Sequence, residues 1–195
     1  METLTNMVKS GLPPREEILA LLHEHTETPG LRKHALAVEA AMRAYAGRFG
    51  EDPDLWGATG LIHDFDYEKH PSPEEHPRFG CAILKERGFP QALIDAVMGH
   101  AVYTGTPRVT PLARALFASD ELCGMITATA LVQPGKTLGE VTPDSVLRKM
   151  KSKSFARSVN RDEIEIGAQE LGVPLTEHVA YVLSALQAQA GALGL

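Results

Sequence analysis

The sequence predicts an all-α fold, a bundle of helices, and three observations support this prediction. Apolar residues recur at helical spacing in one segment after another, and no strand-like alternation extends beyond four residues. Proline or a capping residue opens most of these segments, and glycine follows several of them. A chain of 195 residues with 44% hydrophobic content is sufficient for one core and short for two, so we expect a single domain.

The first four helices are expected over residues 13–25, 28–49, 53–64 and 72–85. Proline lies at the start of the first three, where its fixed φ suits the first helical turn, and Gly50 stops the second. Ser72, followed by Pro73 and then by Glu75 three residues after the serine, predicts a capping box that opens the fourth. Pro77 is tolerated there because it lies in the first turn.

The remaining helices are expected over residues 90–102, 111–132, 142–150, 160–171 and 174–190. Proline opens four of them, and Asn160 with Glu163 caps the other, which Gly172 ends. Residues 133–142 contain Pro134, Gly135 and Gly139, so we expect a flexible loop there.

Cysteine usage and the N-terminus indicate a cytoplasmic protein. Cys81 and Cys123 form no CxxC pair, so neither a thiolate zinc site nor a disulfide framework is predicted. No basic segment followed by an apolar run opens the chain, and no stretch approaches the roughly 20 apolar residues that cross a bilayer. We therefore expect a soluble protein without a membrane partner, and the net charge of −6 disfavours duplex DNA.

Side chains of metal-ligand type occupy four positions where helical spacing predicts an apolar residue. Asp120, for example, lies four residues after Leu116 and three after Phe117. A lone histidine on an apolar face is more often a satisfied core residue, but four such positions favour one shared cation over four separate hydrogen-bonding arrangements. The candidate ligands are His34, His63, Asp64, His76, His100 and Asp120. The other histidines, which we expect at the surface, are His23, His25, His70 and His178.

The segment from Arg148 to Arg161 holds six basic residues and no acid in an otherwise acidic chain. Such a tract is either a clamp for phosphate or a solvated turn that relieves negative charge, and composition weighs the two about equally. If it is a clamp, its members are expected to be Lys149, Lys151, Lys153 and Arg161.

The ordered set His34, His63-Asp64 and Asp120 resembles the signature of the HD superfamily of metal-dependent phosphohydrolases. His76 and His100 resemble the extra histidines of HDIG-type members, and nearly the whole chain is similar to small bacterial HDIG-type proteins described as hydrolases. The resemblance implies one HD domain over residues 1–195, with a core at about 28–132, a helical extension at about 142–190 and a buried metal centre.

By this resemblance, His34, His63, Asp64 and Asp120 hold one metal, and Asp64 bridges to a second metal held by His76 and His100. Two features depart from the pattern. Ala101 follows His100 where several two-metal phosphodiesterases have a second histidine, and Phe65-Asp66 replaces the Ile-Gly of the HDIG motif. No GYP signature follows, so cyclic dinucleotide hydrolysis is not expected.

The predicted activity is hydrolysis of a phosphoester or phosphoanhydride in a nucleotide or other small phosphorylated metabolite by a metal-activated water, with Asp64 as the principal ligand. One or two divalent transition metals, Mn, Fe, Co, Ni or Zn, suit imidazole and carboxylate ligands. Asp66, Glu68 and Lys69 are unassigned candidates for proton transfer. Two alternatives stay open. The ligand set is also similar to HD-type mixed-valence di-iron oxygenases acting on small hydroxylated or phosphonate substrates, and a metal-stabilised binding module without turnover is the third possibility.

Overall fold

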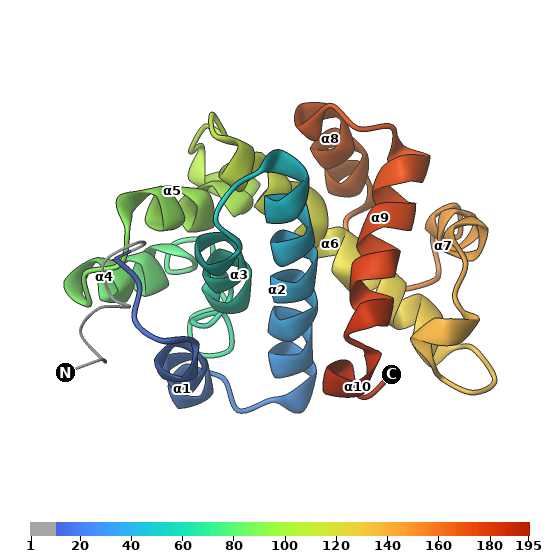
Figure 1. Cartoon of the computed structure of the whole chain (residues 1–195), viewed down its shortest axis with the longest axis horizontal. Helices are drawn as coiled ribbons and strands as arrows, with labels where there is room; N and C mark the ends of the chain where they lie inside the picture. The colour runs from blue at the N-terminus through green and yellow to red at the C-terminus, as the bar shows by residue number, and fades with distance from the viewer. Residues whose placement is uncertain (1–10) are drawn as a thin grey trace.

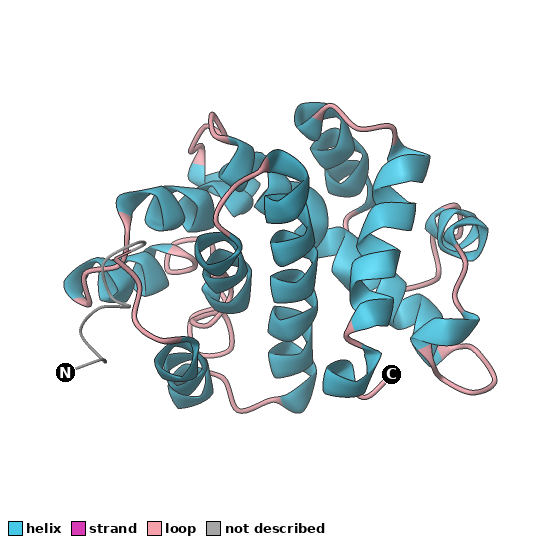
Figure 2. Ribbon diagram, viewed as in Figure 1, coloured by secondary structure: helices cyan, strands magenta, loops and turns pink. Residues whose placement is uncertain are grey.

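The structure, a computed structural model, describes residues 11–195, and these residues form helices and loops without a strand (Figure 2). The α-helices are α1 (Arg15–His25), α2 (Pro29–Phe49), α3 (Pro53–Ile62), α4 (Arg78–Glu86), α5 (Gln91–His100), α6 (Pro111–Leu131), α7 (Pro143–Met150), α8 (Arg161–Leu171), α9 (Leu175–Ala188) and α10 (Ala190–Leu193). Two short 3-10 helices are η2 (Val102–Thr104) and η3 (Leu138–Glu140). The all-α prediction is confirmed.

The fourth predicted helix starts later than expected, since α4 begins at Arg78. The side chain of Ser72 does contact Glu75, with its Oγ donating to Oε2 at 3.1 Å, but the contact belongs to a turn. Helical conformation is disfavoured for a residue that precedes proline, so His76 cannot easily continue a helix into Pro77. The expected helix over 174–190 is also divided, because α9 ends at Ala188 and α10 follows it.

Helix α2 lies in the middle of the bundle, with α3 on one side and α9 on the other, while α6 crosses behind it (Figure 1). One cluster of buried side chains joins α2 and α6 with α7, α8 and α9. A second cluster joins α1, α3, α4 and α5. Both clusters include residues of α2, so this helix is shared between the two halves of the core.

Close packing of α3 on α2 depends on a glycine. A Cβ atom at Gly60 would lie 2.8 Å from the carbonyl oxygen of Val38 and 2.9 Å from the nitrogen of Glu39, distances that real Cβ atoms avoid. Because this position lacks a side chain, the end of α3 can approach α2 directly. His63, which follows α3, is thereby brought next to His34 of α2, and their ring centroids lie 5.3 Å apart.

The prediction that His178 lies at the surface is wrong, because its side chain is fully buried. Tyr45 of α2 donates its hydroxyl proton to Nδ1 of His178 at 2.5 Å, and Nε2 donates to the carbonyl oxygen of Ala118 in α6 at 2.8 Å. His178 lies four residues before buried Val182, on the same face of α9. Because His178 lies near the polar start of the helix, the sequence did not show that it belongs to the apolar face of α9.

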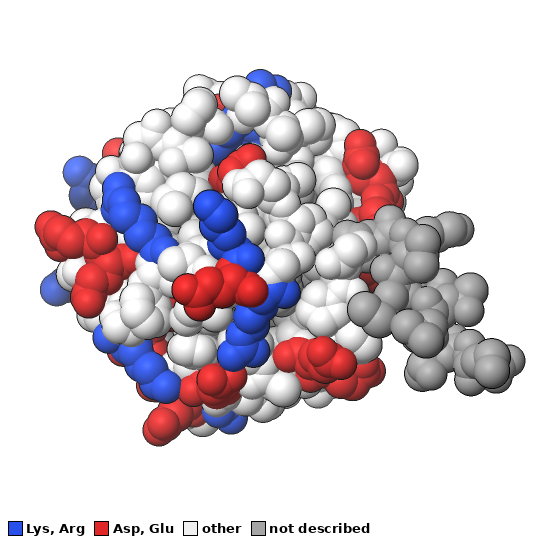
Figure 3. Space-filling model, turned by 90° about the vertical axis from the view of Figure 1, so that its left-hand side faces the viewer, with Lys and Arg blue, Asp and Glu red and all other residues white. Residues whose placement is uncertain are grey.

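The surface that faces the viewer in Figure 3 carries acidic and basic side chains interspersed, without an extended patch of one sign. Within residues 11–195, no helix has both the length and the apolar composition that crossing a membrane requires.

Candidate metal centre

All six predicted ligands come together in the bundle, although they lie on segments far apart in the chain. They form two groups, and within each group the ligand atoms all lie within 4.8 Å of one another. Asp64 belongs to both groups. The first group is His34, His63, Asp64 and Asp120, and the second is Asp64, His76 and His100.

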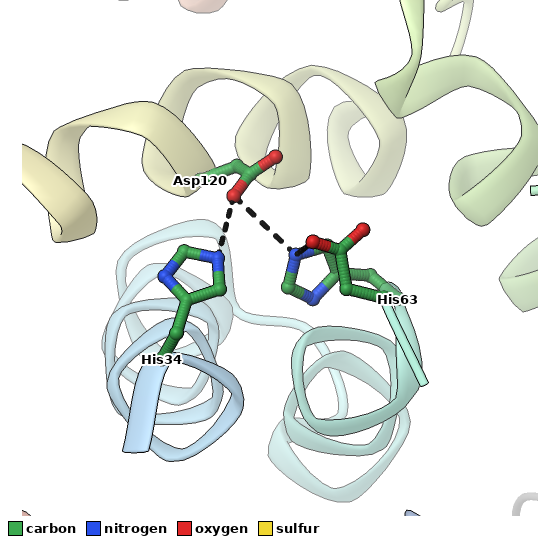
Figure 4. A group of neighbouring side chains, drawn as sticks. His34, His63 and Asp120 are labelled. Atoms are coloured by element: carbon green, nitrogen blue, oxygen red, sulfur yellow. Dashed lines mark hydrogen bonds and ion pairs between the residues drawn. The ribbon is translucent and has the colours of Figure 1, made fainter. Parts of the chain in front are cut away.

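The first group joins α2, the end of α3 and α6 (Figure 4). Nε2 of His34 lies 2.9 Å from Oδ1 of Asp120, and Nε2 of His63 lies 3.3 Å from the same oxygen. The other carboxylate oxygen near His63 is Oδ2 of Asp64, at 3.5 Å. Two imidazoles and two carboxylates therefore direct their donor atoms at one point.

The second group lies on the other side of Asp64. Its Oδ1 is 3.3 Å from Nε2 of His76 and 3.1 Å from Nε2 of His100, and the two imidazole nitrogens are 3.3 Å apart. His76 comes from the turn before α4, and His100 is the last residue of α5. The carboxylate of Asp64 thus has one oxygen near each group.

Three of the four histidines are oriented by a hydrogen bond from Nδ1, the ring nitrogen that faces away from the centre. The acceptors are the carbonyl oxygen of Gly60 for His63, at 2.8 Å, and that of Val97 for His100, at 2.5 Å. Nδ1 of His76 instead donates to Oδ1 of Asp66 at 2.8 Å. When Nδ1 carries the proton, neutral imidazole presents a lone pair at Nε2, as metal ligation requires.

The electrostatics of the cluster favour a bound cation. Nε2 of His63 is buried and has no hydrogen-bond partner within residues 11–195, and carboxylate oxygens of Asp120 and Asp64 lie 3.3 and 3.5 Å from it. Burial by itself lowers the pKa of His63, but Asp64 and Asp120 outweigh it and raise the pKa to about 10. Burial by itself raises the pKa of Asp120, but His63, followed by His34, outweighs burial and holds this pKa below its usual range. A proton or a metal ion must therefore balance these carboxylates, and the bare Nε2 atom fits a metal.

Comparison with known proteins agrees with this geometry. Residues 31–125 match the model of the family described as HD domain, and this span contains all six candidate ligands. This part of the chain is an HD domain. Proteins with an HD domain are generally metal-dependent hydrolases. No curated protein and no solved structure matches the chain significantly, so the narrower HDIG-type assignment stays a prediction.

The candidate metal centre opens into a pocket of about 350 Å³. Five of the six ligands line this pocket, and His63 lies beneath them, fully buried. The residues that complete the lining are Leu31, Tyr67, Ala101, Val102, Tyr103, Glu121, Gly124, Ser158, Val159 and Glu163. None of these residues had a predicted function, because a helical pattern does not tell which exposed side chains surround a distant cavity.

The basic tract reaches the HD pocket through different residues from those expected. Ser158 and Val159 line it, whereas Lys149, Lys151, Lys153 and Arg161 do not. Lys149 lies over the ring of Phe155, 4.6 Å from its centroid, and Lys151 and Lys153 are exposed. The phosphate clamp expected from the sequence therefore has no support from this arrangement.

Arg161 instead organises the loop before α8. Its guanidinium group donates to four backbone carbonyl oxygens of that loop, which belong to Ser152, Phe155, Ala156 and Val159. Ala156 has a φ of 41°, a left-handed conformation that is strained for a residue with a Cβ atom. One cation thus holds the loop in the shape that brings Ser158 and Val159 to the pocket.

The three candidates for proton transfer have other contacts. Asp66 is fully buried, and its Oδ2 accepts the backbone N–H of Gly80 at 2.7 Å in addition to the bond with His76. Glu68 accepts hydrogen bonds from Glu27 and Thr28 at the start of α2, and Lys69 donates to the carbonyl oxygen of Glu24. None of the three lines the pocket. Asp66 is a positioning residue for His76.

Proposed function

We propose that this HD-domain protein is a phosphohydrolase, which cleaves a phosphoester or phosphoanhydride of a nucleotide or another small phosphorylated metabolite. One observation carries the proposal: two ligand groups that share Asp64 open into one pocket. A shared carboxylate between two cation positions is the arrangement that two-metal phosphoryl transfer uses.

The ligand set supports one or two divalent transition metals, such as Mn, Fe, Co, Ni or Zn, since it consists of imidazoles and carboxylates without thiolates. When bound, such a metal lowers the pKa of a water molecule and offsets negative charge on phosphoryl oxygens. Asp64 would contribute one oxygen to each position, and the hydrogen bonds at Nδ1 would keep His63, His76 and His100 in the ligating tautomer.

In the proposed reaction, the oxygen of water bonds to phosphorus while the bond from phosphorus to the leaving oxygen breaks. The attacking water gives up a proton, and the leaving oxygen takes one up. The phosphoryl group leaves with the oxygen of water, and the other product is an alcohol from an ester or a phosphate from an anhydride. The role of the chain is to hold the reacting groups in line over Asp64, within walls provided by η2 and by the loop before α8.

A phosphate-release assay tests this function. Purified protein is stripped with a chelator, reloaded with Mn, Co, Ni, Fe or Zn, and incubated with a panel of phosphomonoesters, nucleotides and pyrophosphate. We expect metal-dependent phosphate release in wild type, and neither release nor full metal content in Asp64→Ala. Glu165→Gln, an exposed change in α8, is the matched control and should behave as wild type. Absence of release with every metal, with metal bound, would reject the proposal.

An oxygenase with a pair of iron ions is the second candidate function. Asp64, His76 and His100 can form its second metal position without an additional histidine. Anaerobic purification with iron, followed by partial oxidation and electron paramagnetic resonance, distinguishes the two. A coupled mixed-valence signal together with oxygen consumption would favour the oxygenase. Metal without either activity would favour a binding module.

A further inference from the structure

The pocket over the metal centre is small and carries an unusual charge for a site that receives phosphate. Its volume of about 350 Å³ lies near the lower end of the range for small-molecule sites. Among the described residues, no lysine and no arginine lines it. Sites for di- and triphosphates surround the additional phosphates with such cations, because each extra charge needs its own partner.

Two carboxylates beyond the metal ligands line the same pocket. They belong to Glu121, which follows Asp120 in α6, and Glu163 in the first turn of α8. Asn160 fixes both, since its backbone N–H donates to Oε2 of Glu121 at 3.0 Å and its Nδ2 donates to Oε1 of Glu163 at 2.6 Å. Each glutamate keeps one oxygen that makes no hydrogen bond within the described residues.

Four carboxylates line the pocket, those of Asp64, Asp120, Glu121 and Glu163, and like charges in one pocket repel one another. A second anion brought into the pocket would meet the same repulsion, whereas an uncharged or cationic group would not.

The remaining walls suit an uncharged or cationic group as well. Tyr67 and Tyr103 are 42% and 50% exposed, and Val102, which also lines the pocket, is 51% exposed. The ring of Tyr67 packs edge-on against the metal-ligand candidate His76, with centroids 5.2 Å apart, so it stands beside the centre. Exposed aromatic faces bind apolar groups and ammonium ions, and they repel anions from their negative faces.

We propose that the pocket selects small substrates with a single phosphoryl group and an uncharged or cationic remainder, that it rejects a second anionic group, and that Glu163 imposes this selection. The inference rests on the proposed function for the position of the phosphoryl group at the metal centre. It narrows the substrate class from phosphorylated metabolites in general to small monophosphates without another negative charge.

Three phosphonates of equal length test the selection without turnover, because hydrolysis of a phosphoester does not cleave a carbon–phosphorus bond. Aminopropylphosphonate, hydroxypropylphosphonate and phosphonopropionate end in an ammonium, a hydroxyl and a carboxylate group. Binding to the metal-loaded full chain is measured by calorimetry, with metal content checked in the same samples. We expect the first two to bind at least about tenfold more tightly than phosphonopropionate, the difference that one unfavourable charge contact produces.

Glu163→Gln identifies the residue responsible, because glutamine keeps the oxygen that accepts from Asn160 and removes the charge. We expect it to bring the affinity for phosphonopropionate close to that for hydroxypropylphosphonate, at unchanged metal content. Glu165→Gln removes the same charge from an exposed position of α8 outside the pocket and should keep the wild-type difference. Equal binding of all three compounds by wild type, no binding of any of them, or an unchanged difference in Glu163→Gln would overturn the proposal.

Phosphate release from the corresponding esters separates this inference from the proposed function. Phosphoethanolamine and phosphoglycolate are the two esters compared. Release from both at equal rates would overturn the charge selection and support hydrolysis. Retained binding order among the phosphonates without phosphate release from any ester would support the selection and reject hydrolysis.

Discussion

Nδ1 of His76 donates to Oδ1 of Asp66 at 2.8 Å, and this hydrogen bond directs Nε2 of His76 toward Asp64. The second oxygen of Asp66 accepts the backbone N–H of Gly80, where a Cβ atom would lie 2.9 Å from Cγ of Asp66. A buried carboxylate, a glycine and an imidazole therefore form one unit that orients a candidate metal ligand.

Asp66→Asn should weaken the second metal position and spare the first. The amide keeps the shape of the side chain, but its NH₂ group faces Nδ1 of His76 and favours the tautomer whose proton is on Nε2. We expect a loss of about 10- to 100-fold in affinity for the second metal, as replacement of such orienting groups usually causes. Metal titration by calorimetry measures both positions. Equal stoichiometry and affinity in variant and wild type would refute the positioning role.

Arg161→Ala should loosen the loop before α8 without removing metal. The substitution leaves four backbone carbonyl oxygens without their donor, and we expect a loss of about 1–3 kcal/mol in the free energy of unfolding. Urea denaturation measures the loss, and limited proteolysis locates new cleavage within residues 152–160. Arg157→Ala, an exposed change in the same loop, is the control. Wild-type stability and protease resistance in Arg161→Ala would contradict this account.

His178→Phe should destabilise the protein most at neutral pH. The change leaves the Tyr45 hydroxyl and the Ala118 carbonyl oxygen without their partner, at a cost of about 1–3 kcal/mol. Burial lowers the pKa of His178, so its contribution is fully present above about pH 6.5, the unfolded value, and is lost as pH falls toward the folded pKa. Urea denaturation at pH 7.5 and 5.5 should show a smaller difference between wild type and variant at the lower pH. A difference that grows on acidification would contradict the assigned charge state.

Metal binding should release protons and should strengthen as the pH rises. Against the effect of burial, nearby carboxylates raise the pKa of His63 to about 10 and that of His76 to about 9. In the metal-free protein, the stability from these ion pairs is fully present below about pH 6.5 and is lost as pH rises through 9 to 10. A metal must displace these protons, so its affinity increases over the same interval. Calorimetry at pH 7.5 in two buffers of different ionisation enthalpy counts the protons. Binding without proton release would contradict the charge state assigned to the two imidazoles.

The clustering of the candidate ligands was predictable, because helical spacing places His34, His100 and Asp120 on faces that must be buried. The side chains that orient the ligands were not. Asp66 contacts His76 only because the chain turns back before α4, and the spacing of residues in the sequence does not predict that turn. A charged residue just after a helix is usually exposed, whereas Asp66 is fully buried.

Most helix boundaries followed from proline and glycine, because these residues act locally through φ and the missing N–H. The start of α4 did not, since the capping contact of Ser72 is compatible with a turn as well as a helix. Charge content alone did not decide between a phosphate clamp and a solvated turn at the basic tract. Composition identifies six cations there, but the direction of a side chain depends on the loop, and Arg161 turns back to bind its own backbone.

The central claim is that two cation positions share Asp64, and anomalous diffraction from crystals of the manganese- or iron-loaded protein tests it most directly. We predict one anomalous peak among His34, His63, Asp64 and Asp120, and a second among Asp64, His76 and His100. Absence of any peak at these side chains in metal-loaded crystals, or metal bound only elsewhere on the chain, would contradict the account.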